Sequence, residues 1–138
     1  MSSHPFSSKG LSNLAAEGTI SEVKMQVEEN RVRYDLEIYK GATYRKTAWF
    51  KQNKQPIDLT GYSAKAQIRP SLNSETLTVE LTVEIDLEEG AITMGIEPEI
   101  TATLPQSIQE WDLQVIDPDG IVYYYIYGKV YIIGRVTV

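Results

Sequence analysis

The chain contains no cysteine and a single histidine among its 138 residues. The absence of cysteine excludes disulfide bridges, thiolate metal sites and a cysteine nucleophile. His4 is the only histidine and lies in a Ser-rich N-terminal stretch, so we predict neither histidine acid–base catalysis nor a multi-histidine metal site. Glycine-rich phosphate loops of the GxGxxG or GxxxxGK[ST] type are also missing. We therefore expect no catalytic residues, no metal and no cofactor.

Long apolar runs and clusters of basic residues are missing as well. No segment approaches the length of a membrane span, and the N-terminus lacks the apolar core of a signal peptide. The formal net charge is −6, and phosphate contacts need concentrated Lys and Arg. The sequence therefore predicts a soluble, unexported protein that has no nucleic-acid or membrane partner.

The charges that are present are divided unevenly along the chain. Residues 1–69 carry eleven Lys and Arg against seven Asp and Glu, whereas residues 70–138 carry two against twelve. Patches of opposite sign would steer subunits together. Alternatively, the charges mix on solvated strand faces once the chain folds.

Apolar and aromatic side chains dominate residues 121–138, which carry two charges. Alternate residues of a strand point to opposite faces, and neither face of this segment alternates with polar residues. Both faces are therefore expected to be covered, either by a partner subunit or because two strands, broken at Gly128 or Gly134, are central in a sandwich with tyrosine hydroxyls at its rim. The candidate assembly interface consists of Tyr123, Tyr124, Tyr125, Tyr127, Tyr131 and Ile133.

The first 31 residues differ in composition from the rest and are predicted to form an N-terminal arm. The start is rich in Ser, Gly and Pro, and Gly18 limits any helix to about two turns. Candidate arm contacts are Phe6, Leu11 and Leu14. Alternation from Ile20 to Glu28, followed by residues 32–38, predicts an extra β-hairpin at the end of the arm.

Short alternating segments continue through residues 32–138, which we expect to form one domain. Strands are predicted near residues 42–50, 62–69, 77–85, 91–96 and 111–116, besides those at the two ends. Residues 98–104, bounded by two prolines, predict one short helix. Seven to nine short strands at this spacing predict an antiparallel β-sandwich, with a small barrel as the alternative.

Three features are weighed as possible chemistry. Glu110 and Asp112 lie two residues apart on one predicted strand. This spacing fits a glycosidase acid pair or, more simply, a strand face in contact with water. The DPDG segment at residues 117–120 contains part of a calcium-loop pattern but fits a hairpin turn better. Trp49, Trp111 and the tyrosines would serve a sugar-binding platform, although both tryptophans also fit positions in the core or at its rim.

A series of phrases, in this order, resembles the small N-terminal domain of tailed-phage upper baseplate proteins and related virion proteins. The resemblance covers residues 34–138. The phrases are KGATY at residues 40–44, PIDLTGY at 56–62, AKAQIR at 64–69, TATLP at 101–105, WDLQV at 111–115, DPDG at 117–120 and GKV at 128–130.

This resemblance implies an immunoglobulin-like sandwich without catalytic residues, acting as a scaffold in the virion. Its expected partners are other virion proteins and copies of itself in a symmetric homo-oligomer. The added arm, and the end of the chain at Val138 where related proteins continue into a fibre, favour a standalone adaptor, a head or tail decoration, or a neck component. Removing residues 1–31 is expected to abolish assembly without unfolding the sandwich. The alternative is a carbohydrate- or receptor-binding module of the particle that recognises a cell-surface glycan.

Overall fold

The computed structural model describes residues 19–23 and 31–136, which form ten strands and one short helix. The predicted all-β class with a single short helix is confirmed, and two of the strands have only two residues. The elements are β1 (Thr19–Val23), β2 (Val32–Arg33), β3 (Leu36–Tyr39), β4 (Tyr44–Gln52), β5 (Gln55–Pro56), β6 (Ser63–Arg69), β7 (Val79–Asp86), β8 (Ala91–Ile96), α1 (Pro98–Thr101), β9 (Ser107–Ile116) and β10 (Val122–Ile133).

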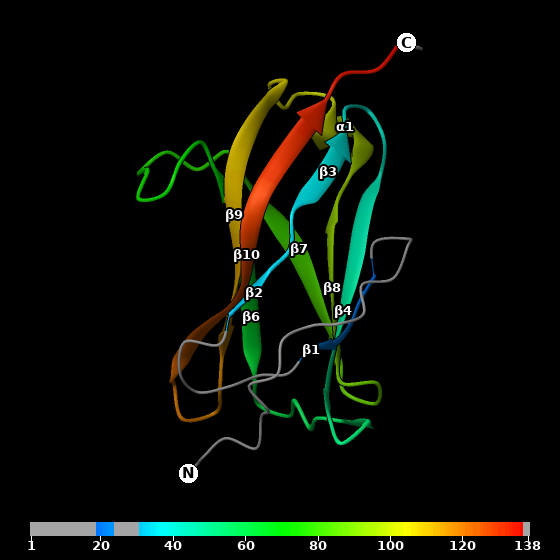
Figure 1. The fold of residues 1–138 in the computed structure, drawn as a ribbon, viewed down its shortest axis with the longest axis vertical. Coiled ribbons are helices and arrows are strands. Elements are labelled where there is room, and N and C mark those ends of the chain that lie inside the picture. The colour runs from blue at the N-terminus through cyan, green and yellow to red at the C-terminus, as the bar shows by residue number, and fades with distance from the viewer. Residues whose placement is uncertain (1–18, 24–30, 137–138) are drawn as a thin grey trace.

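The strands form a sandwich whose two layers are joined by β7 (Figure 1). The hydrogen-bonded order is β1-β4-β8-β7-β6-β9-β10-β2. β3 also pairs with β10, along a later part of that strand than β2 does. The first part of β7 pairs with β6 and the rest pairs with β8, so one strand passes from one layer to the other. The grouping of β4, β7 and β8 against β6, β9 and β10 is that of an immunoglobulin-like sandwich.

The core lies between the two layers and takes its side chains from both. Phe50 of β4, Met94 of β8 and Leu113 of β9 are fully buried there. Along β9 every second residue is buried, so the intervening Asp112 and Gln114 are turned to the outer face of the layer. Alternation in the sequence therefore sets which side chains line the core and which line the outer face.

A β-bulge in β10 reverses the alternation that the sequence predicts for the C-terminal segment. Tyr124 pairs with Gln114 and Ile126 pairs with Leu113, which leaves Tyr125 as the extra residue. Tyr125 and Ile126 are both buried as a result, and Tyr127 lies on the opposite face from Tyr123. The predicted break at Gly128 is wrong, because β10 runs unbroken through this residue and ends just before Gly134.

The strands near the N-terminus pair differently from the predicted hairpin. β1 pairs in parallel with β4, and both β2 and β3 pair in parallel with β10. These pairings join segments that are far apart in the sequence, whereas a hairpin would have joined neighbours. The expected hairpin turn and the candidate arm contacts Phe6, Leu11 and Leu14 lie outside the described residues. Within the described ranges, no helix is long and apolar enough to cross a membrane.

Candidate binding and assembly surface

The outer face of the layer formed by β6, β9, β10 and β3 carries the most distinctive surface of the molecule. Strand register places its side chains in rows that cross the face. Tyr131 of β10 lies opposite Ile108 of β9 and Glu37 of β3, and Ile133 lies opposite Tyr39 in the next row. Directly opposed residues on one face are side-chain neighbours. The rows therefore define two adjoining areas, one apolar and one hollowed and polar.

The apolar patch consists of Tyr39, Ile108, Tyr131 and Ile133. Ile108 is 61% exposed and Tyr39 is 50% exposed, and the other two side chains are half-buried. An outer sheet face in contact with water normally carries polar residues at such positions. The patch is therefore an exposed apolar area on a sheet face where polar side chains are usual.

Charged side chains of both signs border the apolar patch. Lys129 Nζ donates to Glu110 Oε2 at 2.6 Å in the row next to Tyr131 and Ile108. Glu37 accepts a hydrogen bond from the Tyr39 hydroxyl at 3.3 Å, and Arg33 pairs with Asp35 at 3.2 Å. Side chains of both signs therefore lie near the patch, and each is bonded to a neighbour within the chain.

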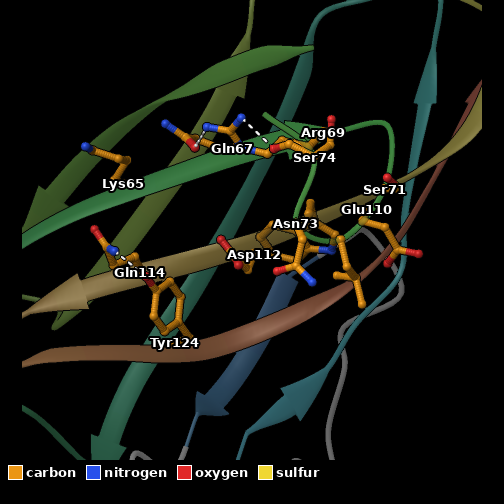
Figure 2. A pocket seen from close by; sticks show the side chains of 12 residues that line it. Lys65, Gln67, Arg69, Ser71, Asn73, Ser74, Glu110, Asp112, Gln114 and Tyr124 are labelled. Carbon is orange, nitrogen blue, oxygen red and sulfur yellow. Dashed lines mark hydrogen bonds between the residues drawn. The ribbon is translucent and has the colours of Figure 1, made fainter. Parts of the chain in front are cut away.

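A groove of about 410 Å³ lies next to the apolar patch on the same outer face (Figure 2). Its floor is the outer side of the paired strands β6 and β9. The loop at residues 71–74 overhangs one end of the groove, and Tyr124 of β10 lies at the other. Leu72 and Trp111 contribute apolar surface to the groove, and its polar side chains are Lys65, Gln67, Arg69, Ser71, Asn73, Ser74, Glu110, Asp112, Gln114 and Tyr124.

Hydrogen bonds hold most of the polar groups around the groove in place. Arg69 donates to the Gln67 side-chain oxygen at 2.9 Å and to the Ser74 backbone oxygen at 3.1 Å, which ties β6 to the overhanging loop. At the other end, Gln114 Nε2 donates to the Tyr124 hydroxyl at 2.9 Å. Figure 2 shows these bonds along the two sides of the groove. A ligand would therefore meet side chains whose positions are already fixed.

Asp112 lies on the floor of the groove, and its carboxylate forms no hydrogen bond or ion pair with the part of the chain that the structure describes. Burial raises the pKa of this carboxyl, and the charges of Arg31 and Arg69 offset part of the rise. Glu110, the next acid on the same face, is bonded to Lys129. The two acids weighed as a pair are thus in unlike settings: Glu110 is held by Lys129 through Oε2, whereas both oxygens of Asp112 are unbonded within the described part of the chain.

The six candidate interface residues do not form one surface. Tyr123 and Tyr125 are 6% and 2% exposed and belong to the core, where their rings stack with centroids 5.2 Å apart. Placing these two in an interface is wrong, because the bulge and the inner face bury them. Tyr124 lines the groove, and Tyr131 and Ile133 belong to the apolar patch.

Tyr127 has a separate setting on the outer face of β10. The Arg31 guanidinium lies 4.1 Å from the centre of the Tyr127 ring, a cation–π contact. Arg31 Nε also donates to the Tyr124 backbone oxygen at 3.2 Å. The ring of Tyr127 is thus occupied by a residue of the same chain and is separated from the apolar patch by the row of Lys129.

The two tryptophans cannot form a common sugar platform. Trp111 is 3% exposed, and its indole N–H donates to the Tyr34 backbone oxygen at 2.8 Å, so it is a core residue of one layer. Trp49 is half-buried on β4 in the other layer, opposite Ala91. The platform interpretation is therefore wrong for this pair.

The DPDG segment forms the turn between β9 and β10, as predicted. Asp117 is buried, and its Oδ1 accepts hydrogen bonds from the backbone N–H groups of Asp119 and Ile121, each at 2.9 Å. Gly120 has a φ of 85°, in the left-handed region that glycine adopts without strain. Within the described ranges, no three His, Cys, Asp or Glu side chains are grouped as metal ligands would be.

Sequence reasoning missed several residues of this surface. Ile108 lies before the predicted start of its strand at residue 111, because β9 begins earlier than its apolar alternation indicates. Tyr39 joins the patch through the parallel pairing of β3 with β10, for which the local sequence carries no signal. Gln67 and Arg69 belong to a predicted strand and Asn73 follows it, and only the overhang of the loop brings them to one groove.

No protein-family model matches the chain, and no curated protein matches it. Among solved structures, the N-terminal domain of phage TP901-1 ORF48 is similar, with a TM-score of 0.45 and 13% identity, over 86% of this chain and 95% of that one. The Listeria monocytogenes internalin-like protein lmo2027 has a TM-score of 0.39 and 14% identity, again over 86% of this chain. The chain spans 30% of the length of that second protein. Similarities at this distance assign neither a family nor a function to the chain.

Proposed function

We propose that the protein is a non-enzymatic structural component of a bacteriophage particle that assembles through the outer face of β3, β9 and β10. The apolar patch is the observation that carries the proposal. Its four side chains are contiguous across three strands, and burying such side chains against a partner stabilises the complex by about 25 cal/mol per Å² of apolar surface. This role would place the protein in the virion as a baseplate, tail, neck or fibre-anchoring adaptor.

A second copy of the chain is the partner that the patch fits best. Point-group symmetry brings identical or complementary patches together, and a two-fold contact is made by the same surface on both subunits. The basic side chains at the border of the patch are Lys129 and Arg33, and the acidic ones are Glu37 and Glu110. Two copies of a face with charges of both signs can place unlike charges opposite each other.

The phrases that resemble phage upper baseplate domains support the scaffold role through that resemblance, and several of their residues make structural contacts here. Thr101 in TATLP is fully buried; its hydroxyl accepts a hydrogen bond from the Gly41 N–H at 3.0 Å and donates to the Ala42 oxygen at 2.8 Å. Asp58 in PIDLTGY accepts hydrogen bonds from the N–H and hydroxyl of Thr60. A side chain at Gly128 in GKV would collide with the Tyr34 backbone. These residues hold turns and strands together.

Light scattering on a sizing column tests the proposal through the mass of the purified chain near neutral pH. We expect the wild type to be a discrete oligomer, a dimer where the patch makes a two-fold contact with itself. Ile108→Asp places a charge in the apolar patch and should shift the mass to that of a monomer. Leu87→Asp is the matched control, because Leu87 is a 52% exposed apolar residue that lies outside the patch, after β7.

Circular dichroism of each variant separates a lost interface from a lost fold. A wild-type monomer would contradict assembly through this face. An oligomer that Ile108→Asp and Leu87→Asp leave equally intact would also contradict it, because the interface would then lie elsewhere.

A further inference from the structure

The groove over β6 and β9 has a composition that differs from the neighbouring apolar patch and points to a ligand of its own. Its volume of about 410 Å³ lies within the range of small-molecule sites. Two cations, Lys65 and Arg69, and two carboxylates, Glu110 and Asp112, line it, so their formal charges cancel. Side-chain amides of Gln67, Asn73 and Gln114 occupy the positions between them.

We propose that this groove binds a neutral saccharide. A sugar hydroxyl both donates and accepts hydrogen bonds, and the groove offers both functions at close spacing. Asp112 contributes a carboxylate that the described part of the chain leaves unbonded, and it accepts from sugar hydroxyls. Arg69 and the amides of Asn73 and Gln114 donate to sugar oxygens, and the side-chain oxygens of these two amides accept, whereas the oxygen of Gln67 already accepts from Arg69.

Tyr124 provides the apolar contact that a sugar ring requires. Its side chain is 46% exposed at one end of the groove and is fixed there by the hydrogen bond from Gln114 to its hydroxyl. A phenol ring combines a flat apolar face with a polar tip, so it can pack against the C–H side of a sugar while its hydroxyl stays bonded. Figure 2 shows Tyr124 and Gln114 at one end and Asn73 at the other, with Asp112 between them.

The charges of the groove disfavour ionic ligands. An anion near Arg69 would also meet Asp112 on the neighbouring strand, and a cation near Asp112 would also meet Arg69 and Lys65. A neutral ligand meets neither penalty. The proposed binding is separate from the proposed assembly, because Tyr39, Ile108, Tyr131 and Ile133 of the apolar patch do not line the groove.

The test uses the full chain on a broad immobilised panel of neutral glycans, followed by titration calorimetry with the free form of whichever glycan binds best. Asp112→Asn keeps the shape of the side chain and removes the charged acceptor, and Tyr124→Ala removes the ring. Each should weaken binding about tenfold or more, because a hydrogen bond to a charged group or a lost aromatic contact is worth this factor. Glu84→Gln, an exposed acid on β7, is the matched control and should leave the affinity unchanged.

Binding that these two groove variants weaken and Glu84→Gln does not would establish the site. The same variants should keep the oligomeric mass of the wild type, so a failure of this proposal is distinct from a failure of the assembly proposal. No binding to any neutral glycan of the panel would overturn it. Binding that survives both groove substitutions would also overturn it. A lysine-containing peptide is tested in parallel, and tighter binding of this peptide than of every glycan would likewise overturn the proposal.

Discussion

The carboxylate of Asp117 holds the turn between β9 and β10 from a buried position. Its Oδ1 accepts from two backbone N–H groups, and its Oδ2 accepts a longer bond from the Tyr123 hydroxyl at 3.4 Å. The Asp117 N–H also donates to the Ile121 oxygen at 3.0 Å, which closes the turn from the other side. A charged acceptor used in this way is structural, which explains why an acidic turn occurs next to the aromatic core.

Replacing this carboxylate should destabilise the fold. Asp117→Ala leaves the N–H groups of Asp119 and Ile121 without their acceptor, at a cost of about 2–4 kcal/mol in the free energy of unfolding. Urea denaturation measures this loss, and Asp119→Ala, an exposed neighbour, is the control, expected to change the same quantity by less than about 0.5 kcal/mol. Equal effects of the two substitutions would contradict the structural role of Asp117.

The carboxylate of Asp112 in the groove should make the free energy of unfolding depend on pH. Its pKa is raised in the folded state, so between the unfolded value and the folded value the native state binds more protons than the unfolded state. The contribution of Asp112 to the free energy of unfolding is therefore most favourable at low pH, and it decreases as pH rises through that window. The charged groups that face Asp112 are Arg31, Arg69 and Lys65, with Glu110 on its own strand.

Comparison with Asp112→Asn isolates this effect, since asparagine does not titrate. Urea denaturation near pH 3 and near pH 7, on either side of the ordinary aspartate pKa of about 3.9, gives the two free energies of unfolding. We expect the variant to gain stability relative to the wild type as pH rises. A difference between the two proteins that stays constant or changes in the opposite direction would show that burial does not raise this pKa.

At the scale of the elements, the bulge in β10 decides which tyrosines reach the surface. Tyr125 is the extra residue of the bulge, and its ring packs against Tyr123 and, edge-on, against Phe50 with centroids 6.3 Å apart. Without the bulge, Tyr127 would follow Tyr123 and Tyr125 onto the inner face. Because of it, the later half of β10 turns Lys129, Tyr131 and Ile133 outward, where they form and border the apolar patch.

Deleting Tyr125 should restore regular pairing while preserving the orientation of the residues on both sides. The chain is expected to fold with a loss of about 3–5 kcal/mol, the usual effect of removing a buried aromatic side chain. The control deletion removes Asp112 from the regular strand β9, which would turn Leu113 outward and Gln114 inward. Thermal unfolding followed by circular dichroism should show a cooperative transition for the first deletion and none for the second. The reverse result would contradict this assignment of the bulge.

Local alternation predicts much of this fold and little of its pairing. The strand expected over residues 91–96 coincides with β8, and the one expected over 62–69 lies within a residue of β6. The parallel pairings of β1 with β4 and of β3 with β10 depend on distant segments, so no local pattern marks them. The bulge is equally hidden, because consecutive tyrosines give no sign of which one is extra.

The same limit applies to the candidate surface. Tyr131 and Ile133 could be predicted, since their segment is apolar on both faces and one face had to remain outside the core. Ile108 and Tyr39 could not, because they join the patch only through strand register. The groove depends on the loop at residues 71–74 folding over β9, which is a tertiary feature with no sequence motif.

At the scale of the whole molecule, one layer of the sandwich carries both proposed activities on its outer face. The apolar patch would join copies of the chain, and the adjacent groove would remain open to a saccharide. The DPDG turn, the buried Thr101 and the core tyrosines hold the layers that support this face. The central claim is therefore that the patch of Tyr39, Ile108, Tyr131 and Ile133 is covered by a second copy.

Thiol labelling tests this claim directly, because the chain has no cysteine of its own. Ile108→Cys places a single thiol in the patch with little change in character, and Leu87→Cys places one at a similarly exposed site away from it. We predict that, at concentrations where the chain is assembled, a maleimide reagent reacts slowly with Ile108→Cys and rapidly with Leu87→Cys. On dilution, the two rates should become equal. Equal labelling at every concentration would contradict the account, because the patch would then be open to solvent.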